Sequence, residues 1–290
     1  MKLKSKVLNV LDKTLLRLLD DKTYLKIKYK MEMKKELNFE KVQTFNEKLQ
    51  WLKINDRKDI YTTMVDKYEA KEYVSKNIGK EYIIPTIGIF NNFDEIDFEK
   101  LPEKFVMKCT HDSGGIILCR NKKEFDKEKA RKKINKQLKK NFYKNFREWP
   151  YKNVKPRIIV EDFIGENLTD YRIYCFNGKA KYVYMYINNS ETTNEKPEPE
   201  NCNIYDIEWN LQDFHQKSLP TKENYKKPEQ LERMKEISEK LSKDTKFLRV
   251  DFYLIDGKIL FSEMTFFPGA GFSQFYPEEA DYKLGRELKI

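Results

Sequence analysis

The sequence predicts an α+β fold, with helices and strands mixed along the chain (α/β mixed), on three observations. Apolar residues recur at helical spacing in segments such as LERMKEISEKLSK. The short apolar segments KFVMKC and RIIVEDFI have the length and composition of buried strands. Two further segments turn at Asn177-Gly178 and at Asp256-Gly257, which are dipeptides typical of tight β-hairpins.

The first 60 residues are predicted to be helical. Thr44 precedes FNEKLQWL, and Glu47 follows three residues later in the spacing of a capping box, so a new helix is expected there. An earlier segment, VLNVLDKTLLRLL, has one apolar face among lysines and aspartates. That face packs either on the protein's own core or on the anionic inner surface of a membrane. Its apolar residues are Val7, Leu8, Leu11, Leu15, Leu16 and Leu19.

Residues 66–164 alternate between helix and strand. DKYEAKEYVSKNIG is predicted to be a helix that ends at Gly79, and YIIPTIGIF a strand that is broken at Pro85. The strand KFVMKC leads into the glycine-bearing loop HDSGG, and IILCR is the next strand. A long, very basic helix is expected over residues 122–146, before the buried strand RIIVEDFI.

The carboxyl-terminal half contains the two predicted hairpins. DYRIYCFNGKAKYVYMYI forms the first, and FLRVDFYLIDGKILFSEMTF forms the second after the helix LERMKEISEKLSK. Residues 188–230 are polar and contain prolines, so they are expected to be a loop over the site or a flexible insert. The last 20 residues are a short, polar segment.

The chain is strongly basic, with 57 lysines and arginines against 47 aspartates and glutamates and a net charge of +10. This balance suits nucleic acid, anionic lipid or phosphorylated small molecules. Because the lysines are spread over the whole chain, no nucleic-acid partner is expected. The four cysteines form no CxxC pair and there are only two histidines, which favours reduced thiols in the cytoplasm over a zinc site.

No stretch of the sequence has the roughly 20 apolar residues of a membrane span. The amino terminus also lacks the apolar core and cleavage site of a signal peptide. We therefore expect a cytoplasmic protein, with peripheral association at the inner face of the cell membrane through the basic N-terminal helix as a further expectation.

Polar residues on the last hairpin carry the strongest chemical signal. Arg249 and Asp251 are two apart on one strand, and Glu263 and Thr265 are two apart on the next, so each pair points to one face. Two carboxylates and a hydroxyl beside a guanidinium suit Mg²⁺ that bridges phosphate oxygens. The alternative, a solvent-facing polar row, fits less well because the segment is otherwise apolar.

This hairpin resembles the metal-binding hairpin of ATP-grasp enzymes, with R-x-D, E-x-[NT] and then Pro268-Gly269. Thr265 stands where most of that superfamily has asparagine. The resemblance implies that Lys67 and Lys108 contact nucleotide phosphates, and that the loop after Lys108 closes over them with backbone N–H groups. That loop contains His111, Ser113, Gly114 and Gly115.

The strand IIVEDFI resembles the hinge strand of the same superfamily. The resemblance implies that backbone groups near Glu161 and Ile164 meet the adenine edge. A carboxylate soon afterwards would hold the ribose hydroxyls, and Glu166 is the candidate, with Asp170 as its competitor.

Over roughly residues 40–275 the chain resembles the TupA-like ATP-grasp family. FNEKLQWLK, VDKYEAKEYV, IIPTIGIF, FVMKCTHDSGG, DYRIYCFNGK, YDIEWN and FSEMTFFPGAG carry this resemblance. It implies an ATP-grasp fold of two α+β subdomains that grip ATP, over residues 61–164 and 165–290, after an N-terminal helical segment over residues 1–60. It also places the chain in bacterial cell-surface polysaccharide biosynthesis, such as teichuronopeptide, capsule or O-antigen synthesis.

The implied activity is that of a carboxylate–amine ligase with ATP and Mg²⁺ as cofactors. Lys108 and Arg249 are the expected catalytic residues, and the metal ligands are Asp251, Glu263 and Thr265. The carboxylate is expected on a small-molecule or lipid-linked sugar, such as a uronic acid, and its partner is an amine or amino acid. Asp170 and Arg172 are the candidates for contact with that substrate.

Two other functions remain open from the residues. A glycosyltransferase that uses a nucleotide-sugar would share a metal-binding carboxylate pair, although the chain has no D-x-D motif. A polyanion- or membrane-binding adaptor would use the basic segment 122–146 and the net positive charge.

Overall fold

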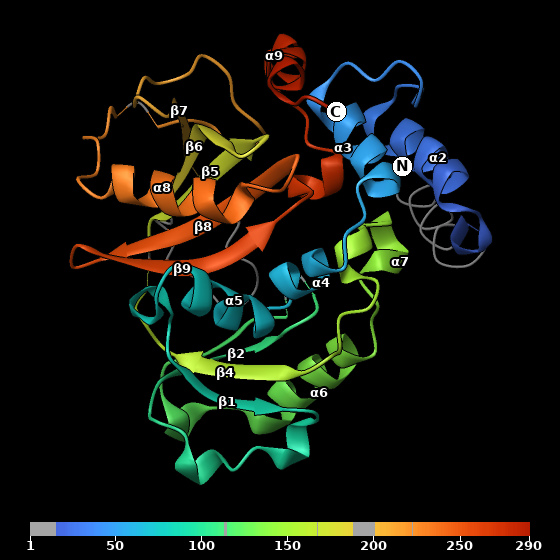
Figure 1. Cartoon of the computed structure of the whole chain (residues 1–290). Coiled ribbons are helices and arrows are strands. Elements are labelled where there is room, and N and C mark those ends of the chain that lie inside the picture. The colour runs from blue at the N-terminus through green and yellow to red at the C-terminus, as the bar shows by residue number, and fades with distance from the viewer. Residues whose placement is uncertain (1–15, 113–114, 167, 188–200, 222) are drawn as a thin grey trace.

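The computed structural model contains two antiparallel sheets with helices around them, as Figure 1 shows. The predicted α+β class is confirmed. No described helix is long and apolar enough to span a bilayer. The structure describes residues 16–112, 115–166, 168–187, 201–221 and 223–290.

The first sheet has four strands in the order β1-β4-β2-β3. Helix α6 (Lys127–Leu138) packs against β2, and the fully buried Ile134 joins the apolar cluster on that side of the sheet. The expected strands in YIIPTIGIF, KFVMKC, IILCR and RIIVEDFI are all present. They are β1 (Thr86–Phe90), β2 (Phe105–Cys109), β3 (Ile117–Cys119) and β4 (Ile158–Asp162).

The second sheet has five strands in the order β7-β6-β5-β8-β9. Helix α8 (Leu231–Ser242) covers one face through contacts with β5, β6 and β8. The other face carries the polar residues of the last hairpin. The strands are β5 (Asp170–Phe176), β6 (Lys179–Ile187), β7 (Asn201–Asp206), β8 (Phe247–Ile255) and β9 (Lys258–Thr265).

Both predicted hairpins form at the predicted turns. Asn177 and Gly178 have φ of 49° and 78°, and Asp256 and Gly257 have φ of 49° and 74°. Two successive left-handed residues define the turn that matches the twist of paired strands, and Asn-Gly and Asp-Gly adopt it readily. The turn sets the β8–β9 register as far as Phe252 opposite Phe261, and a one-residue irregularity between Asp251 and Phe252 then places Asp251 opposite Glu263.

Among the described residues, four α-helices precede the first sheet. The capping box at α3 is confirmed, because the Thr44 side chain accepts from Glu47 N while the Glu47 carboxylate accepts from Thr44 N. The segments of α3 to α5 share the large apolar core with the second sheet. The helices are α2 (Asp21–Met33), α3 (Phe45–Asn55), α4 (Ile60–Val65) and α5 (Glu69–Asn77).

Short 3-10 helices connect the longer elements. Ile83, just after η2, bridges to Phe261 of β9 and so ties the start of the first sheet to the edge of the second. The 3-10 helices of the described residues are η1 (Leu16–Leu18), η2 (Lys80–Tyr82), η3 (Phe93–Glu95), η4 (Phe98–Lys100), η5 (Lys122–Glu124), η6 (Trp149–Tyr151) and η7 (Pro268–Gly271).

Two expectations about elements were wrong, and one helix lies where none had been assigned. The basic helix over residues 122–146 is divided into η5, α6 and the one-turn α7 (Tyr143–Phe146), and Asn141 between them donates to Lys152 O at 3.1 Å. The segment 188–230 contains strand β7. The last 20 residues contain helix α9 (Glu279–Glu287), which packs against α3.

Most of the amphipathic helix expected in VLNVLDKTLLRLL lies outside the described residues, and Leu16–Leu18 form the 3-10 helix η1. The domain boundaries at residues 60 and 164 stay a prediction. The first sheet lies before residue 164 and the second after it, while α4 and α5 pack into the core of the second sheet.

Candidate functional site

A row of charged residues crosses three neighbouring strands of the second sheet. Arg172 on β5 is opposite Asp251 on β8, which is opposite Glu263 on β9. Arg249, one pleat away on the same face, donates through Nε to Asp251 Oδ1 at 2.7 Å and through Nη2 to Asp251 Oδ2 at 2.5 Å. Its Nη2 also lies 2.7 Å from Glu263 Oε1. The hairpin therefore brings together the residues that the sequence singled out.

The two carboxylates differ in exposure. The Asp251 side chain is 3% exposed and the Glu263 side chain 40%, so the row opens to solvent at Glu263. Burial raises the pKa of Asp251, and the nearby Asp170 carboxylate adds to that rise against the effect of Arg249. Burial also opposes the charge of Glu263, but Arg249, Lys67 and Arg172 together hold the pKa of Glu263 below its ordinary value.

This oxygen set fits a hard divalent cation. Thr265 Oγ1 donates to Glu263 Oε1 at 3.2 Å, which places the hydroxyl beside the carboxylates. Each carboxylate oxygen has two lone pairs, so those bonded to Arg249 can accept further contacts. Among the described residues no three His, Cys, Asp or Glu side chains converge. Mg²⁺ sites commonly use one or two carboxylates plus substrate phosphates, so Asp251 and Glu263 suffice.

Lys108 is the next-to-last residue of β2, in the first sheet, and lies near enough to Glu263 for the two charges to interact. Its Nζ lies 2.6 Å from Glu161 Oε2, and Lys71 of α5 forms an ion pair with the other oxygen of Glu161. Burial opposes the charge of Lys108, yet Glu161, Tyr253 and Glu263 raise the pKa of Lys108. Two cations around one buried anion leave an excess positive charge that suits a phosphate.

Lys67 is held against the loop that follows β2. Its backbone N–H donates to Thr110 O at 3.0 Å, and its Nζ donates to Asp112 O. Because the charge of Lys67 acts on Glu263, this lysine also faces the hairpin. Lys67 and Lys108, which are far from the hairpin in sequence, therefore lie near enough to Glu263 for their charges to act on it.

The loop itself is described only in part, because Ser113 and Gly114 lie outside the described residues. His111 is buried, and its Nε2 lies 3.2 Å from Gln137 O, so its ring is directed toward α6. At Gly115 a Cβ would approach Asp112 Oδ1 to 3.1 Å, so the chain there packs closely on the Asp112 carboxylate.

The remaining sequence candidates are placed as follows. Ile164 lies two residues beyond the end of β4, at intermediate exposure. Glu166 forms an exposed 2.7 Å ion pair with Arg120. Asp170 accepts from Arg172 Nε at 2.8 Å, and its Oδ1 is buried with no hydrogen-bond partner in the described part of the chain. The Arg172 guanidinium lies 3.9 Å from the ring centroid of Tyr186.

Two charged residues of this region were not predicted. Lys71 was not separated from the many other lysines, although it lies four residues after Lys67 in a segment expected to be helical. Glu148 is buried just before η6, inside the stretch expected to be a basic helix. Neither has a local sequence signal, because burial of both depends on contacts with distant segments.

The chain belongs to the TupA-like ATP-grasp family. The family model described as TupA-like ATPgrasp matches residues 47–289, which confirms the resemblance stated from the sequence. No curated protein matches the chain.

Solved structures of ligases are similar to this chain, and the first of the three below supports a shared fold. The L-amino acid ligase of Bacillus licheniformis is 14% identical with a TM-score of 0.50, over 84% of this chain and 55% of that one. The D-alanine–D-alanine ligase of Helicobacter pylori is 16% identical with a TM-score of 0.45, over 85% and 68%. The D-alanine–D-alanine ligase of Bacillus anthracis, complexed with ATP, is 16% identical with a TM-score of 0.39, over 70% and 53%. The chain thus spans about half the length of that last enzyme.

Proposed function

We propose that the chain is an ATP-dependent carboxylate–amine ligase of bacterial cell-surface polysaccharide biosynthesis. One observation carries this proposal. The Arg249–Asp251–Glu263 cluster on the second sheet faces Lys67 and Lys108 from the other half of the chain. Cations from both halves of the chain, together with a pair of carboxylates that can bind Mg²⁺, can hold a nucleoside triphosphate. Family membership supports the same conclusion.

In this proposal Lys67 and Lys108 bind the phosphates, and the loop through His111, Ser113, Gly114 and Gly115 covers them. Backbone groups near Glu161 and Ile164 hold the adenine. The Glu161 side chain has no contact with adenine in this proposal, because it forms ion pairs with Lys71 and Lys108. Glu166 is the proposed ribose ligand, because its ion pair with Arg120 is exposed and therefore weak enough to exchange.

Asp251, Glu263 and Thr265 are the proposed Mg²⁺ ligands. When bound, this ion supplies positive charge to the oxygens of the transferred phosphoryl group. The residues of the chain contribute by orienting the reacting groups and by stabilising their charge. Arg249 has both carboxylates as fixed partners, so its guanidinium is directed before substrate arrives and can stabilise charge that develops on the phosphoryl group.

The proposed reaction has two steps. A substrate carboxylate oxygen attacks the γ-phosphorus of ATP, ADP leaves, and an acyl phosphate forms. The amine then attacks the acyl carbon, the C–O bond to phosphate breaks, and inorganic phosphate and the amide are released. Neither step needs a nucleophilic side chain, and Lys108 and Arg249 act by holding the reacting groups.

The substrate carboxylate is proposed to lie along the second sheet next to Arg172. The region there has buried polar atoms without hydrogen-bond partners among the described residues, namely Asp170 Oδ1 and the Tyr184 hydroxyl. Such atoms can accept or donate to the hydroxyls of a uronic acid or a related sugar carboxylate. We also propose a cytoplasmic location, with contact to the inner membrane face if the sugar is lipid-linked.

Hydroxylamine trapping tests this function. The full chain is incubated with Mg-ATP, hydroxylamine and a panel of uronic acids and amino acids, and ADP and hydroxamate are measured by mass spectrometry. We expect both products with at least one carboxylate. Their absence with every carboxylate would contradict the ligase proposal.

Matched variants test the site. Glu263→Gln and Lys108→Ala should abolish ADP formation, because each removes a metal or phosphate contact. Glu229→Gln and Lys226→Ala, at exposed positions of the same residue types, should keep the wild-type rate. Wild-type turnover in either site variant would show that the site is assigned wrongly.

A further inference from the structure

Three polar side chains on one face of α3 are fully buried. Asn46, Gln50 and Lys53 are each 0% exposed, and spacings of four and three residues place them in a row along the helix. Buried polar groups need hydrogen-bond partners, so this face must meet other polar groups. Asn46 donates to Ser273 O at 2.8 Å and accepts from Ser273 N at 3.2 Å. All three residues belong to FNEKLQWLK, a segment to which the proposed reaction gives no role.

Gln50 and Lys53 contact the backbone just before Ser273. Gln50 Nε2 donates to Gly271 O at 2.7 Å and to Ala270 O at 3.2 Å. Lys53 Nζ donates to the same Ala270 O at 2.8 Å. It also donates to Gln50 Oε1 at 2.8 Å, so the lysine orients the amide that holds the loop. The two side chains together thus bind successive carbonyl groups of the loop that contains η7.

This loop has a backbone conformation that needs support from its surroundings. Gly269, Ala270 and Gly271 have φ of 57°, 53° and 67°, so three successive residues are left-handed. A left-handed conformation is unfavourable for a residue with a side chain, which is the case at Ala270. At Gly271 a Cβ would lie 2.3 Å from Gln50 Nε2, so glycine allows the close approach of α3. The hydrogen bonds from α3 therefore offset strain in the loop.

The loop is directly connected to the proposed metal site. Thr265 is the last residue of β9, and only Phe266 and Phe267 separate it from η7. Both of these residues are buried and anchored. The ring centroid of Phe266 lies 4.2 Å from that of Tyr61, and Lys53 Nζ lies 5.7 Å from the ring centroid of Phe267. A connection this short and this well held transmits the position of the loop to Thr265.

A lysine at position 53 is costly for stability alone. Its Nζ is bonded to neutral oxygens, and no carboxylate of the described residues forms an ion pair with it. Burial lowers the pKa of Lys53 to about 7, because removal from water disfavours the charged form. An apolar side chain of similar length would avoid this cost. The contact with the loop therefore gives the buried ammonium group a purpose that packing does not.

We propose that Gln50 and Lys53 are positioning residues for the Mg²⁺ site: they hold the η7 loop and thereby fix the end of β9, where Thr265 lies. This inference rests on the proposed function, which makes Thr265 a metal ligand. Neither side chain touches a reacting group. Each acts through the backbone of the loop, as residues behind a metal ligand orient that ligand and so set the affinity for the metal.

Titration of the full chain with Mn²⁺ in the presence of ADP, followed by electron paramagnetic resonance, tests this role without turnover. Mn²⁺ takes the same kind of oxygen ligands as Mg²⁺. Lys53→Met keeps the length of the side chain but removes the donor to Ala270 O. We expect its affinity for Mn²⁺ to fall by about 10- to 100-fold, the range for loss of a residue that orients a metal ligand.

The matched control is Lys48→Met, on the same helix. Lys48 also donates to two backbone carbonyls, Gly285 O at 2.8 Å and Leu288 O at 2.6 Å, but these belong to the carboxyl-terminal segment and not to the η7 loop. This variant should keep the wild-type affinity. The titration also separates position from folding, because a partly unfolded chain binds fewer ions at the same affinity, whereas a misplaced ligand lowers the affinity itself.

The outcomes distinguish this proposal from the ligase function. Wild-type affinity in Lys53→Met, or an equal fall in Lys48→Met, overturns the positioning role even if hydroxylamine trapping succeeds. If Lys53→Met does not fold by circular dichroism, Gln50→Met, which removes the donor to Gly271 O, takes its place with the same expected fall. A fall confined to the loop variant, without hydroxamate in the wild type, refutes the ligase function alone. Absence of Mn²⁺ binding in the wild type overturns the metal site on which both proposals depend.

Discussion

Lys108 and Glu161 form a diagonal ion pair across β2 and β4, with 2.6 Å between Nζ and Oε2. They are not direct cross-strand partners, since Lys108 is opposite Ile159. Lys71 completes a buried group of two cations and one anion. The three side chains therefore carry a net positive charge in the first sheet before any phosphate binds. The Glu161 carboxylate lowers the free-energy cost of burying the two lysines.

Glu161→Gln should strongly destabilise the chain. The substitution leaves Lys71 and Lys108 as two buried cations without a counter-charge, and breaking a buried pair costs about 3–5 kcal/mol. Urea unfolding followed by circular dichroism measures the free energy of unfolding. Glu166→Gln, which breaks the exposed pair with Arg120, is the matched control and should cost about 1 kcal/mol or less. Equal losses in both variants would contradict the role given to Glu161.

Arg249→Lys should lower the rate of ADP formation by about 10²- to 10³-fold, the range for loss of one transition-state donor. Lysine keeps the charge but cannot bond Asp251 through two nitrogens and Glu263 at the same time, as Arg249 does. Initial rates at saturating Mg-ATP measure the effect. Arg286→Lys, at an exposed position, should retain the full rate, and a full rate in Arg249→Lys would remove Arg249 from the catalytic residues.

Stability should fall as pH rises from about 4.5 to about 7 through the titration of Glu148. Burial raises the pKa of Glu148 from 4.5 to about 7, so the folded chain binds the proton more tightly than the unfolded chain. This contribution is fully present below pH 4.5 and is lost as pH rises through about 7, and it amounts to about 3 kcal/mol at most.

Glu148→Gln should flatten that part of the pH profile, because glutamine does not titrate. The measurement is the free energy of unfolding at intervals of pH for both chains. Lys53, whose pKa burial lowers to about 7, acts above that window and so does not mask the effect. A wild-type slope that Glu148→Gln leaves unchanged would show that another group is responsible.

The parts of the fold that the sequence predicted depend on local chemistry. Asn177-Gly178 and Asp256-Gly257 determine their own turns, and each turn sets the register of the strand residues next to it. The alternation that puts Arg249 with Asp251 and Glu263 with Thr265 could be read from the sequence. The alignment of Asp251 with Glu263 depends on a one-residue irregularity between Asp251 and Phe252, which the turn does not predict. The family resemblance supplied Lys67 and Lys108, which no spacing within the chain links to the hairpin.

The parts that were missed depend on distant contacts. Strand β7 buries Asn203, whose amide donates to Glu223 O at 3.1 Å, so the strand lacks the apolar alternation of its neighbours. Helix α9 packs so closely that a Cβ on Gly285 would lie 2.2 Å from Gln43 O. Glu148 is buried by the folding of the amino-terminal segment onto α7, and no pattern in the local sequence predicts that contact.

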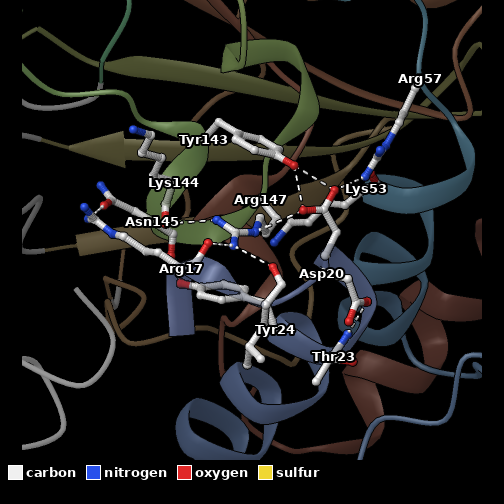
Figure 2. Close-up of polar contacts among 12 residues, drawn as sticks. Arg17, Asp20, Thr23, Tyr24, Lys53, Arg57, Tyr143, Lys144, Asn145 and Arg147 are labelled. Carbon is white, nitrogen blue, oxygen red and sulfur yellow. Dashed lines mark hydrogen bonds and ion pairs between the residues drawn. The ribbon is translucent and has the colours of Figure 1, made fainter. Parts of the chain in front are cut away.

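Asp21→Asn should destabilise the chain by about 1–3 kcal/mol, because Asp21 joins three elements. Its carboxylate accepts from Arg57 Nη2 at 2.6 Å and from the Tyr143 hydroxyl at 2.6 Å, and it pairs with Arg147. Figure 2 labels these three partners. Asparagine keeps the shape but leaves the buried Arg147 guanidinium without its counter-charge. Asp59→Asn is the control, since Asp59 is exposed and caps no N–H group at the start of α4. Thermal unfolding measures both variants, and an equal melting temperature for the two would mean that the amino-terminal segment does not hold Arg147 in place.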